Sequence, residues 1–373
     1  MFEHEDILND LNRDIPIDEK LRVIHSAAKR QYDFIDRIAV ATHDAGSGVL
    51  NTFIYSGDRA PLVHYETTLD QAPSLEEIKN TGRPRVVNDL SIFDAGTREH
   101  TIRIKNEGYG SSYTCPMFLN GELEGFIFFN SYRKNCFTVQ ALPVLDVFAH
   151  LVAAMVSNEM LTARTLLAAL KTSKEMAHQR DPETAGHLNR MARFCHVIAH
   201  ALAAEGKHDL DDKFIEDVFL FAPMHDIGKI GIPDNVLLKA GKLNDEEFEI
   251  MKAHAMKGRQ IIDSIIKNFN LGSFLNIDVL RNIAEYHHEA MDGSGYPHGA
   301  KGDEIPIEAR ITAVADIFDA LTSERPYKPA WSNKEALAFI KRMAKDKLDK
   351  DCVSALEENM TMVERIQARF KEA

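Results

Sequence analysis

Histidine and carboxylate residues recur through the second half of this 373-residue chain, at spacings that could bring them together. Glu183 and His187 are four residues apart, so on one helix they would share a face and could bind one ion. His225 and Asp226 are adjacent and follow an apolar, helix-like segment. The complete set of candidate metal ligands is Glu183, His187, His225, Asp226, His254, His287, His288 and Asp316.

These residue types suit divalent transition metals. Imidazole and carboxylate groups bind iron, manganese or zinc, and a mixed set can hold several ions. A carboxylate such as Asp226 can bridge two ions with its two oxygens. Two ions about 3.5–4 Å apart can clamp the attacking and leaving oxygens of a phosphate ester and acidify the water between them. The pattern alone therefore indicates a metal site and phosphate hydrolysis, without naming the substrate.

Each of these residues also has a structural interpretation. A single histidine on a helix is more often structural than a ligand, and His-Asp is a common dipeptide. His196 and His200 form another pair with a spacing of four, but they begin nine residues beyond His187, about 180° around the helix. We therefore interpret this pair as structural or exposed. The same interpretation applies by default to His178, His298 and Asp319.

The elements that must position these residues change character along the chain. Up to about residue 137, the sequence predicts an antiparallel α+β domain with strands at 33–42, 49–56, 111–119 and 123–131. Asn120-Gly121 is a strong hairpin signal, and Ser74 to Glu77 read as a capping box that opens a short helix. From Pro182 onward the chain is nearly all helix, with segments expected at 183–205, 211–224, 245–265, 277–288, 306–323, 333–345 and 350–371.

A helical stripe joins the two parts. It continues for about forty residues from Thr138, which is too long for an ordinary globular helix. We interpret it as a linking helix that pairs with a second copy of the chain; the alternative is two shorter helices, each packed on its own domain. The predicted organisation is an N-terminal domain over 1–137, the linking helix over 138–178 and a catalytic domain over 179–373.

Charge and composition exclude some classes of protein. A formal net charge of −13 argues against non-specific binding to DNA or RNA, which needs a basic surface. No apolar run approaches the roughly 20 residues that span a bilayer, and the acidic start of the chain does not resemble a signal peptide. The four cysteines lack a Cys-x-x-Cys pair and are expected to be free thiols. We therefore predict a cytoplasmic protein that binds neither a nucleic acid polymer nor a membrane.

Two long motifs closely resemble those of the HD-GYP phosphodiesterases, a branch of the HD superfamily. They are His225-Asp226-Ile227-Gly228-Lys229 and His287-His288-Glu289, the latter followed by Gly295-Tyr296-Pro297. The resemblance covers about residues 172–370 and includes Arg180–Thr184, Ala315–Thr322 and Arg325–Lys328. It implies an all-α domain that hydrolyses cyclic di-GMP to pGpG, GMP or both.

The resemblance also implies roles for individual residues. The eight candidate ligands match the family's metal positions, and a glutamate in the position of Glu183 accompanies a form with three ions, so two or three divalent ions are expected. Iron is expected first, manganese second and zinc third. Asp226 and Lys229 match catalytic positions, and the substrate would contact Lys229, Tyr296, Arg325 and Lys328. Each of these residues has a structural alternative. Lys229 could be a surface lysine, and Tyr296 could only shape its loop. Arg325 and Lys328 could be a solvated pair of charges.

The N-terminal part resembles GAF sensor domains more weakly. The similarity rests on Cys115–Phe129, a strand, an Asn-Gly turn and a second strand, and on the following Phe137-Thr138. It implies a homodimer formed through this domain and the linking helix, or the binding of an unidentified small molecule. No motif for a tetrapyrrole or a haem is present in the sequence.

Three rival functions follow from the same residues. The substrate could be a mixed cyclic dinucleotide such as cyclic GMP-AMP. The chain could instead bind cyclic di-GMP without hydrolysing it and transmit a signal through the linking helix. A nucleotidase of the HD type is the third rival, which the Gly295-Tyr296-Pro297 loop disfavours.

Overall fold

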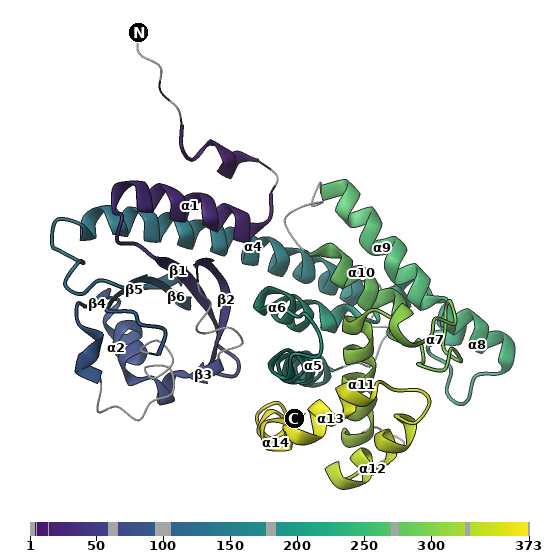
Figure 1. Cartoon of the computed structure of the whole chain (residues 1–373). Helices are drawn as coiled ribbons and strands as arrows, with labels where there is room; N and C mark the ends of the chain where they lie inside the picture. The colour runs from purple at the N-terminus through teal and green to yellow at the C-terminus, as the bar shows by residue number, and fades with distance from the viewer. Residues whose placement is uncertain are drawn as a thin grey trace. The chain divides into compact units, whose positions relative to one another are not determined.

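The structure of the protein is a computed structural model that describes residues 4, 6–13, 15–58, 66–93, 106–176, 184–269, 276–324 and 329–371. Of helix residues 166, 167, 169–171 and 173–176 it describes the backbone alone. The chain forms two compact units, residues 1–162 and residues 163–373 (Figure 1). We call them the N-terminal unit and the C-terminal unit and describe each by itself.

The N-terminal unit is built on a six-stranded antiparallel sheet with the strand order β3-β2-β1-β6-β5-β4. The strands are β1 (Arg37–Asp44), β2 (Val49–Gly57), β3 (Glu66–Thr68), β4 (Arg85–Val87), β5 (Ser111–Leu119) and β6 (Glu122–Ser131). The helices are η1 (Asn9–Asn12), α1 (Ile17–Gln31), η2 (Leu69–Gln71), α2 (Pro73–Thr81), η3 (Leu90–Phe93) and the first part of α4 (Leu142–Met176). The predicted antiparallel α+β fold is confirmed.

Both predicted hairpins form in this sheet. β1 pairs with β2, and β5 pairs with β6, each in antiparallel register. Asn120 and Gly121 have φ values of 52° and 87°, which is the geometry that makes Asn-Gly a preferred two-residue hairpin turn. The predicted capping box at Ser74 is wrong, because α2 begins at Pro73, so that Ser74 lies inside the helix, and no side chain caps its start. Proline is favoured at the first helical position, since its missing N–H would have no partner there.

Helices cover both faces of the sheet (Figure 1). On one face, Leu21 and Ile24 of α1 and Leu145 and Val152 of α4 join Phe129 in a large apolar core. On the other face, Ile78 of α2 packs with Leu50, Leu123 and Phe126. Alternating side chains of the strands therefore supply two cores, as expected for a sheet that is buried on both sides.

Helix α4 corrects one expectation from the sequence. Its segment Leu142–Thr165 is long and apolar enough to cross a membrane by length and composition, with a mean hydropathy of 1.4. The prediction that no apolar run approaches the length needed to span a bilayer is therefore wrong. The side chains of Leu145, Val152 and Val156 are fully buried in the core of the N-terminal unit, which accounts for the apolar stripe. α4 is one continuous helix; its pairing with a second copy and the predicted domain limits stay predictions.

The C-terminal unit is all-α, as predicted. Its helices are the last part of α4, α5 (Ala185–Glu205), α6 (Asp212–Phe221), η4 (Ala222–Met224), η5 (Ile227–Gly231), α7 (Asp234–Leu237), α8 (Asp245–Lys252), α9 (His254–Phe269), α10 (Ile277–Tyr286), η6 (Gly302–Glu304), α11 (Ile307–Thr322), α12 (Asn333–Met343), α13 (Lys350–Glu358) and α14 (Met360–Arg369). Two expected helices are each broken in two, at Ala253 and at Asn359. The first break places His254 at the start of α9.

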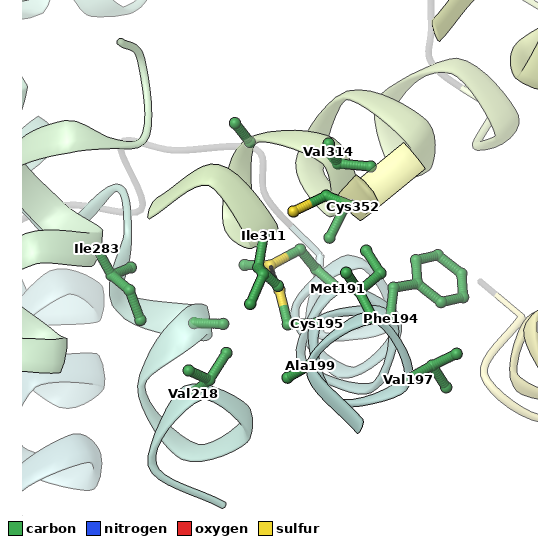
Figure 2. Close-up of a cluster of buried hydrophobic side chains, with 14 of the residues drawn as sticks. Met191, Phe194, Cys195, Val197, Ala199, Val218, Ile283, Ile311, Val314 and Cys352 are labelled. Atoms are coloured by element: carbon green, nitrogen blue, oxygen red, sulfur yellow. Dashed lines mark hydrogen bonds between the residues drawn. The ribbon is translucent and has the colours of Figure 1, made fainter. Parts of the chain in front are cut away.

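Helix α5 lies at the centre of this unit. Figure 2 shows Met191, Phe194 and Cys195 of α5 packed among side chains from the helices around it. The same cluster contains Val218 of α6, Ile283 of α10, Ile311 and Val314 of α11 and Cys352 of α13, which the figure also labels. Because α5 is surrounded, its first turn, which carries His187, is held by the main core of the unit.

Candidate metal centre

Seven of the eight predicted ligands come together in two groups in the C-terminal unit. The first group is Asp226, His254, His287 and His288; the second is His187, His225 and Asp316. Within each group the candidate ligand atoms all lie within 4.8 Å of one another. The eighth residue, Glu183, lies outside the described residues, and α5 begins after it at Ala185. Its pairing with His187 by helical spacing therefore stays a prediction.

Asp226 belongs to the first group and also lies beside His225 of the second group. Its Oδ1 is 3.1 Å from His254 Nε2 and 3.7 Å from His287 Nε2, both in the first group. Its Oδ2 is 3.2 Å from His225 Nε2, in the second group. The two oxygens of one carboxylate thus face different sets of imidazoles, which is the arrangement that a bridging ligand requires.

The partners of the Nδ1 atoms indicate the tautomers of His225, His254 and His287. Nδ1 lies 3.1 Å from Ala222 O in His225, 2.7 Å from Met251 O in His254 and 2.9 Å from Ile283 O in His287. A carbonyl oxygen only accepts, so each Nδ1 donates. Nε2 of each neutral ring is then left with a lone pair. Burial lowers the pKa of His287 and lowers that of His288 well below its usual value, which favours the neutral rings that metals bind.

This arrangement fits cations. The Nε2 lone pairs point at Asp226, which is itself an acceptor, and two acceptors repel unless a positive charge lies between them. Asp226 Oδ1 is buried and accepts no well-formed hydrogen bond, although His254 Nε2 is near. The chemistry of the donors and this buried oxygen both match a site for metal ions. The described part of the chain thus contains a His/Asp cluster that can bind metal.

The second group is supported by Asp319, for which the sequence predicts only a structural role. His187 Nε2 lies 3.9 Å from Asp316 Oδ1, while Nδ1 of the same ring lies 2.8 Å from Asp319 Oδ2. Asp319 is fully buried. It follows Asp316 by three residues on α11, so both carboxylates lie toward one face of the helix. That spacing was the signal that could have identified Asp319.

A close backbone contact joins the elements that carry the first group. A Cβ atom placed on Gly228 of η5 would lie 1.8 Å from the carbonyl oxygen of His254 and 2.4 Å from Gly258 N, both on α9. Only glycine permits this approach. The Gly228 position of the His225–Lys229 motif therefore brings Asp226 within reach of His254.

Lys229 lies beside the same carboxylate. Its Nζ is 2.6 Å from Asp226 Oδ2, and its side chain is about one fifth exposed. The ammonium group thus supplies positive charge at the edge of the cluster, and the partial exposure leaves room for it to turn toward a ligand.

The loop that carries Tyr296 covers one side of the first group. The Tyr296 ring lies 4.7 Å from the His288 ring, between centroids. The buried carboxylate of Glu289 shapes the loop by accepting hydrogen bonds from the backbone N–H of His298, at 2.6 Å, and of Ala300, at 3.1 Å. A Cβ atom on Gly295 would lie 2.3 Å from Ala290 N, so this position also requires glycine.

Lys252 and Phe248 lie near Tyr296, and neither was a candidate in the sequence. Lys252 Nζ lies 5.0 Å from the centre of the Phe248 ring and 5.8 Å from that of Tyr296. Phe248 is 45% exposed, which is unusual for a large apolar side chain beside a polar cluster. Exposed apolar residues occur singly on many surfaces, so no motif would have identified it.

The remaining candidates have separate positions. Arg325, Lys328 and His178 lie outside the described residues. His196 and His200 stack on each other, with His196 against Phe219, and neither belongs to the two groups. His298 Nε2 lies 3.0 Å from Glu285 Oε1.

Comparison with known proteins identifies this half of the chain. Residues 171–352 match the HD domain family, and that segment belongs to it. Curated relatives include a probable cyclic di-GMP phosphodiesterase of Vibrio cholerae, 47% identical over 44% of this chain and 38% of that protein. A cyclic di-GMP phosphodiesterase of Thermotoga maritima is 40% identical over 54% of this chain and 52% of that protein. A 3′3′-cGAMP-specific phosphodiesterase 2 of Vibrio cholerae is 39% identical over 44% of this chain and 30% of that protein. The chain spans about half or less of the length of these relatives.

Solved structures similar to part of the chain include GAF domains. One is from a GAF domain/HD domain protein of Geobacter sulfurreducens, with a TM-score of 0.32 and 14% identity over 39% of this chain and 95% of that chain. Another is the GAF domain of an Acinetobacter phosphoenolpyruvate-protein phosphotransferase, with a TM-score of 0.34 and 11% identity over 42% of this chain and 90% of that chain.

Proposed function

We propose that the chain is a metal-dependent phosphodiesterase that hydrolyses cyclic di-GMP to pGpG, GMP or both. The observation that carries this proposal is the position of Asp226 between two groups of imidazoles whose Nε2 atoms face its oxygens. The names of the relatives supply the substrate class, since several are cyclic dinucleotide phosphodiesterases.

The proposed cofactors are two or three divalent ions, with iron expected before manganese and manganese before zinc. His254, His287 and His288 would hold one ion, His187, His225 and Asp316 another, and Asp226 would contact both. Glu183 would complete a site for a third ion. When bound, the ions supply positive charge for the phosphate oxygens and lower the pKa of a water that attacks phosphorus.

The protein's own groups would bind and orient the substrate. Lys229 would turn its ammonium from Asp226 toward a phosphate oxygen, where it stabilises charge that develops in the transition state. Tyr296 would contact the substrate beside His288, because its ring borders the cluster. Arg325 and Lys328 would contact guanine and phosphate, as the family resemblance implies.

The direct test is turnover by metal-loaded protein. Protein purified without oxygen should convert cyclic di-GMP to pGpG or GMP, as measured by liquid chromatography, and should contain at least two metal ions per chain by elemental analysis. His225→Ala and Asp226→Ala should each lose both metal and turnover. His200→Ala is the matched control, because it removes a histidine of α5 outside both groups and should keep both properties.

Cyclic GMP-AMP is a second candidate substrate, favoured by the relative named for 3′3′-cGAMP. Rates measured in parallel on both cyclic dinucleotides would decide between them. Tight binding of cyclic di-GMP by the metal-loaded protein without any product would instead support a binding protein and refute the proposed hydrolysis.

We further propose that the N-terminal unit regulates the C-terminal unit, as a homodimer in the cytoplasm. Val147 and Leu161 of α4 are 67% and 48% exposed, and a partner helix would cover them. Four free cysteines suit a reducing compartment. Light scattering should give the mass of a dimer, and Val147→Glu with Leu161→Glu should halve it. The competing possibility is that the N-terminal unit binds an unidentified small molecule and does not dimerise. In that case light scattering should give the mass of a monomer for both the unaltered protein and the double variant.

A further inference from the structure

His187 differs from His225, His254 and His287 in the partner of its Nδ1 atom. In His225, His254 and His287 that atom faces a backbone carbonyl oxygen, whereas in His187 it faces the carboxylate of Asp319 at 2.8 Å. A carboxylate fixes the tautomer as a carbonyl does, and its charge also makes the opposite nitrogen a stronger donor to a metal. In the second group, the Asp319 carboxylate can therefore strengthen the binding of a metal by His187, and the three carbonyl-paired histidines have no such charge behind them.

Asp319 is itself held in place by an arginine from α5. Arg190 donates from Nε to Asp319 Oδ1 at 2.7 Å and from Nη2 to Asp319 Oδ2 at 2.9 Å. The hydroxyl of Ser323 accepts from Arg190 Nη2 at 2.7 Å and donates to Asp319 Oδ2 at 3.1 Å. Asp319 is fully buried and Arg190 is 5% exposed, so this fork-shaped pair is protected from water.

The same arginine reaches the C-terminal end of the chain. Arg190 Nη1 donates to the backbone carbonyl oxygen of Phe370 at 2.8 Å, just past the end of α14. One turn along α5, the guanidinium of Arg193 lies 4.1 Å from the centre of the Phe370 ring. Phe370, the residue that follows α14, is thus hydrogen-bonded to the arginine that orients Asp319.

We propose that Asp319, Arg190 and the Phe370 carbonyl act as a chain of positioning residues that sets the metal affinity of the His187–His225–Asp316 group, separately from the Asp226–His254–His287–His288 group. The proposal rests on the proposed function to the extent that both groups bind metal. Loss of the Asp319 carboxylate frees His187 to rotate and removes the charge behind it. Changes to such supporting carboxylates weaken metal binding by about 10- to 100-fold.

The experiment measures metal binding, not activity. Equilibrium dialysis of the full chain against Mn²⁺, followed by elemental analysis, should resolve two classes of site in the unaltered protein. In Asp319→Asn the affinity of one class should fall by about 10- to 100-fold while the other class keeps its affinity. Arg190→Lys, which keeps the charge but not the two-pronged geometry, should give a smaller fall in the same class. Deletion of residues 370–373 should also weaken only that class.

Asp349→Asn is the matched control. Asp349 is another buried aspartate of the C-terminal unit, paired with Arg310 at 3.0 Å, and it belongs to neither metal group. If Asp319→Asn lowers the melting temperature as Asp349→Asn does but leaves both classes of Mn²⁺ site unchanged, Asp319 is merely structural and the proposal is wrong. Equal weakening of both classes would also contradict it. Unaltered protein that binds no Mn²⁺ would refute the proposed metal function instead.

Discussion

Asp217 is a residue whose charge is costly in the folded chain. It lies on α6, is 5% exposed and is paired with Lys213 Nζ at 2.8 Å. Burial outweighs this pairing and raises the pKa of the Asp217 carboxyl from 3.8 to about 6. Between these two pH values the folded chain keeps a proton that the unfolded chain has lost. The free energy of unfolding must therefore fall as the pH rises through this window.

Asp217→Asn should remove that fall, because an amide does not titrate. From the shift of 3.8 to about 6, we expect the unaltered protein to lose up to about 3 kcal/mol relative to the variant between pH 4 and pH 7. Urea unfolding of both metal-free proteins across this range gives the difference. Parallel stability curves for the two proteins would show that Asp217 does not titrate there.

The ligand set itself could be predicted from sequence because its motifs are long and ordered. Seven of the eight predicted ligands gather in the two groups. Asp319 was not recognised, because its spacing of three residues from Asp316 on α11 indicates only a shared helix face and not which side chain it will meet. The pairing of Asp319 with His187 joins residues 132 positions apart, and only the packing of α11 against α5 brings them together.

At the scale of elements, the close contact between η5 and α9 holds Asp226 near His254 of the first group. Gly228→Ala would place a Cβ atom against the backbone of His254 and Gly258, which cannot move without displacing α9. We expect a loss of at least about 2 kcal/mol in the free energy of unfolding and reduced metal content.

Gly231→Ala is the matched control for this contact. It lies on the same short helix, but its Cβ atom would meet only the flexible Lys257 side chain, at 2.8 Å. The free energy of unfolding of the Gly231→Ala variant, measured with urea, should stay within about 0.5 kcal/mol of that of the unaltered protein. Equal effects from the two glycines would show that the η5–α9 contact is not the determinant.

The elements were predicted best where the signal is local. Both hairpins follow from alternation and turn residues, and most helices of the C-terminal unit appear within a few residues of their expected limits. The short strands β3 and β4 were not predicted, since three residues carry too little pattern. The breaks at Ala253 and Asn359 were missed because helical periodicity continues across them and neither glycine nor proline marks them.

At the scale of the whole molecule, the two units have separate cores, and every candidate metal group of the described chain lies in the C-terminal one. Metal that binds only the folded C-terminal unit should stabilise that unit by mass action. We expect chelation to increase hydrogen exchange in buried segments of α5 and α10, while β1 and β6 exchange as before. Increased exchange in both units, or in neither, would contradict this expectation.

Each unit contains a buried thiol whose reaction rate reports how often that unit opens. Cys115 lies in the sheet of the N-terminal unit, and burial raises the pKa of its thiol to about 12. Cys195 and Cys352 are fully buried in the C-terminal core, where burial also raises their pKa values (Figure 2). Such thiols are poor nucleophiles while they are covered, so a thiol reagent can modify them only during the moments when their unit opens. Mass spectrometry of a timed alkylation would therefore measure how often the N-terminal unit and the C-terminal unit open, in one sample and without any engineered label.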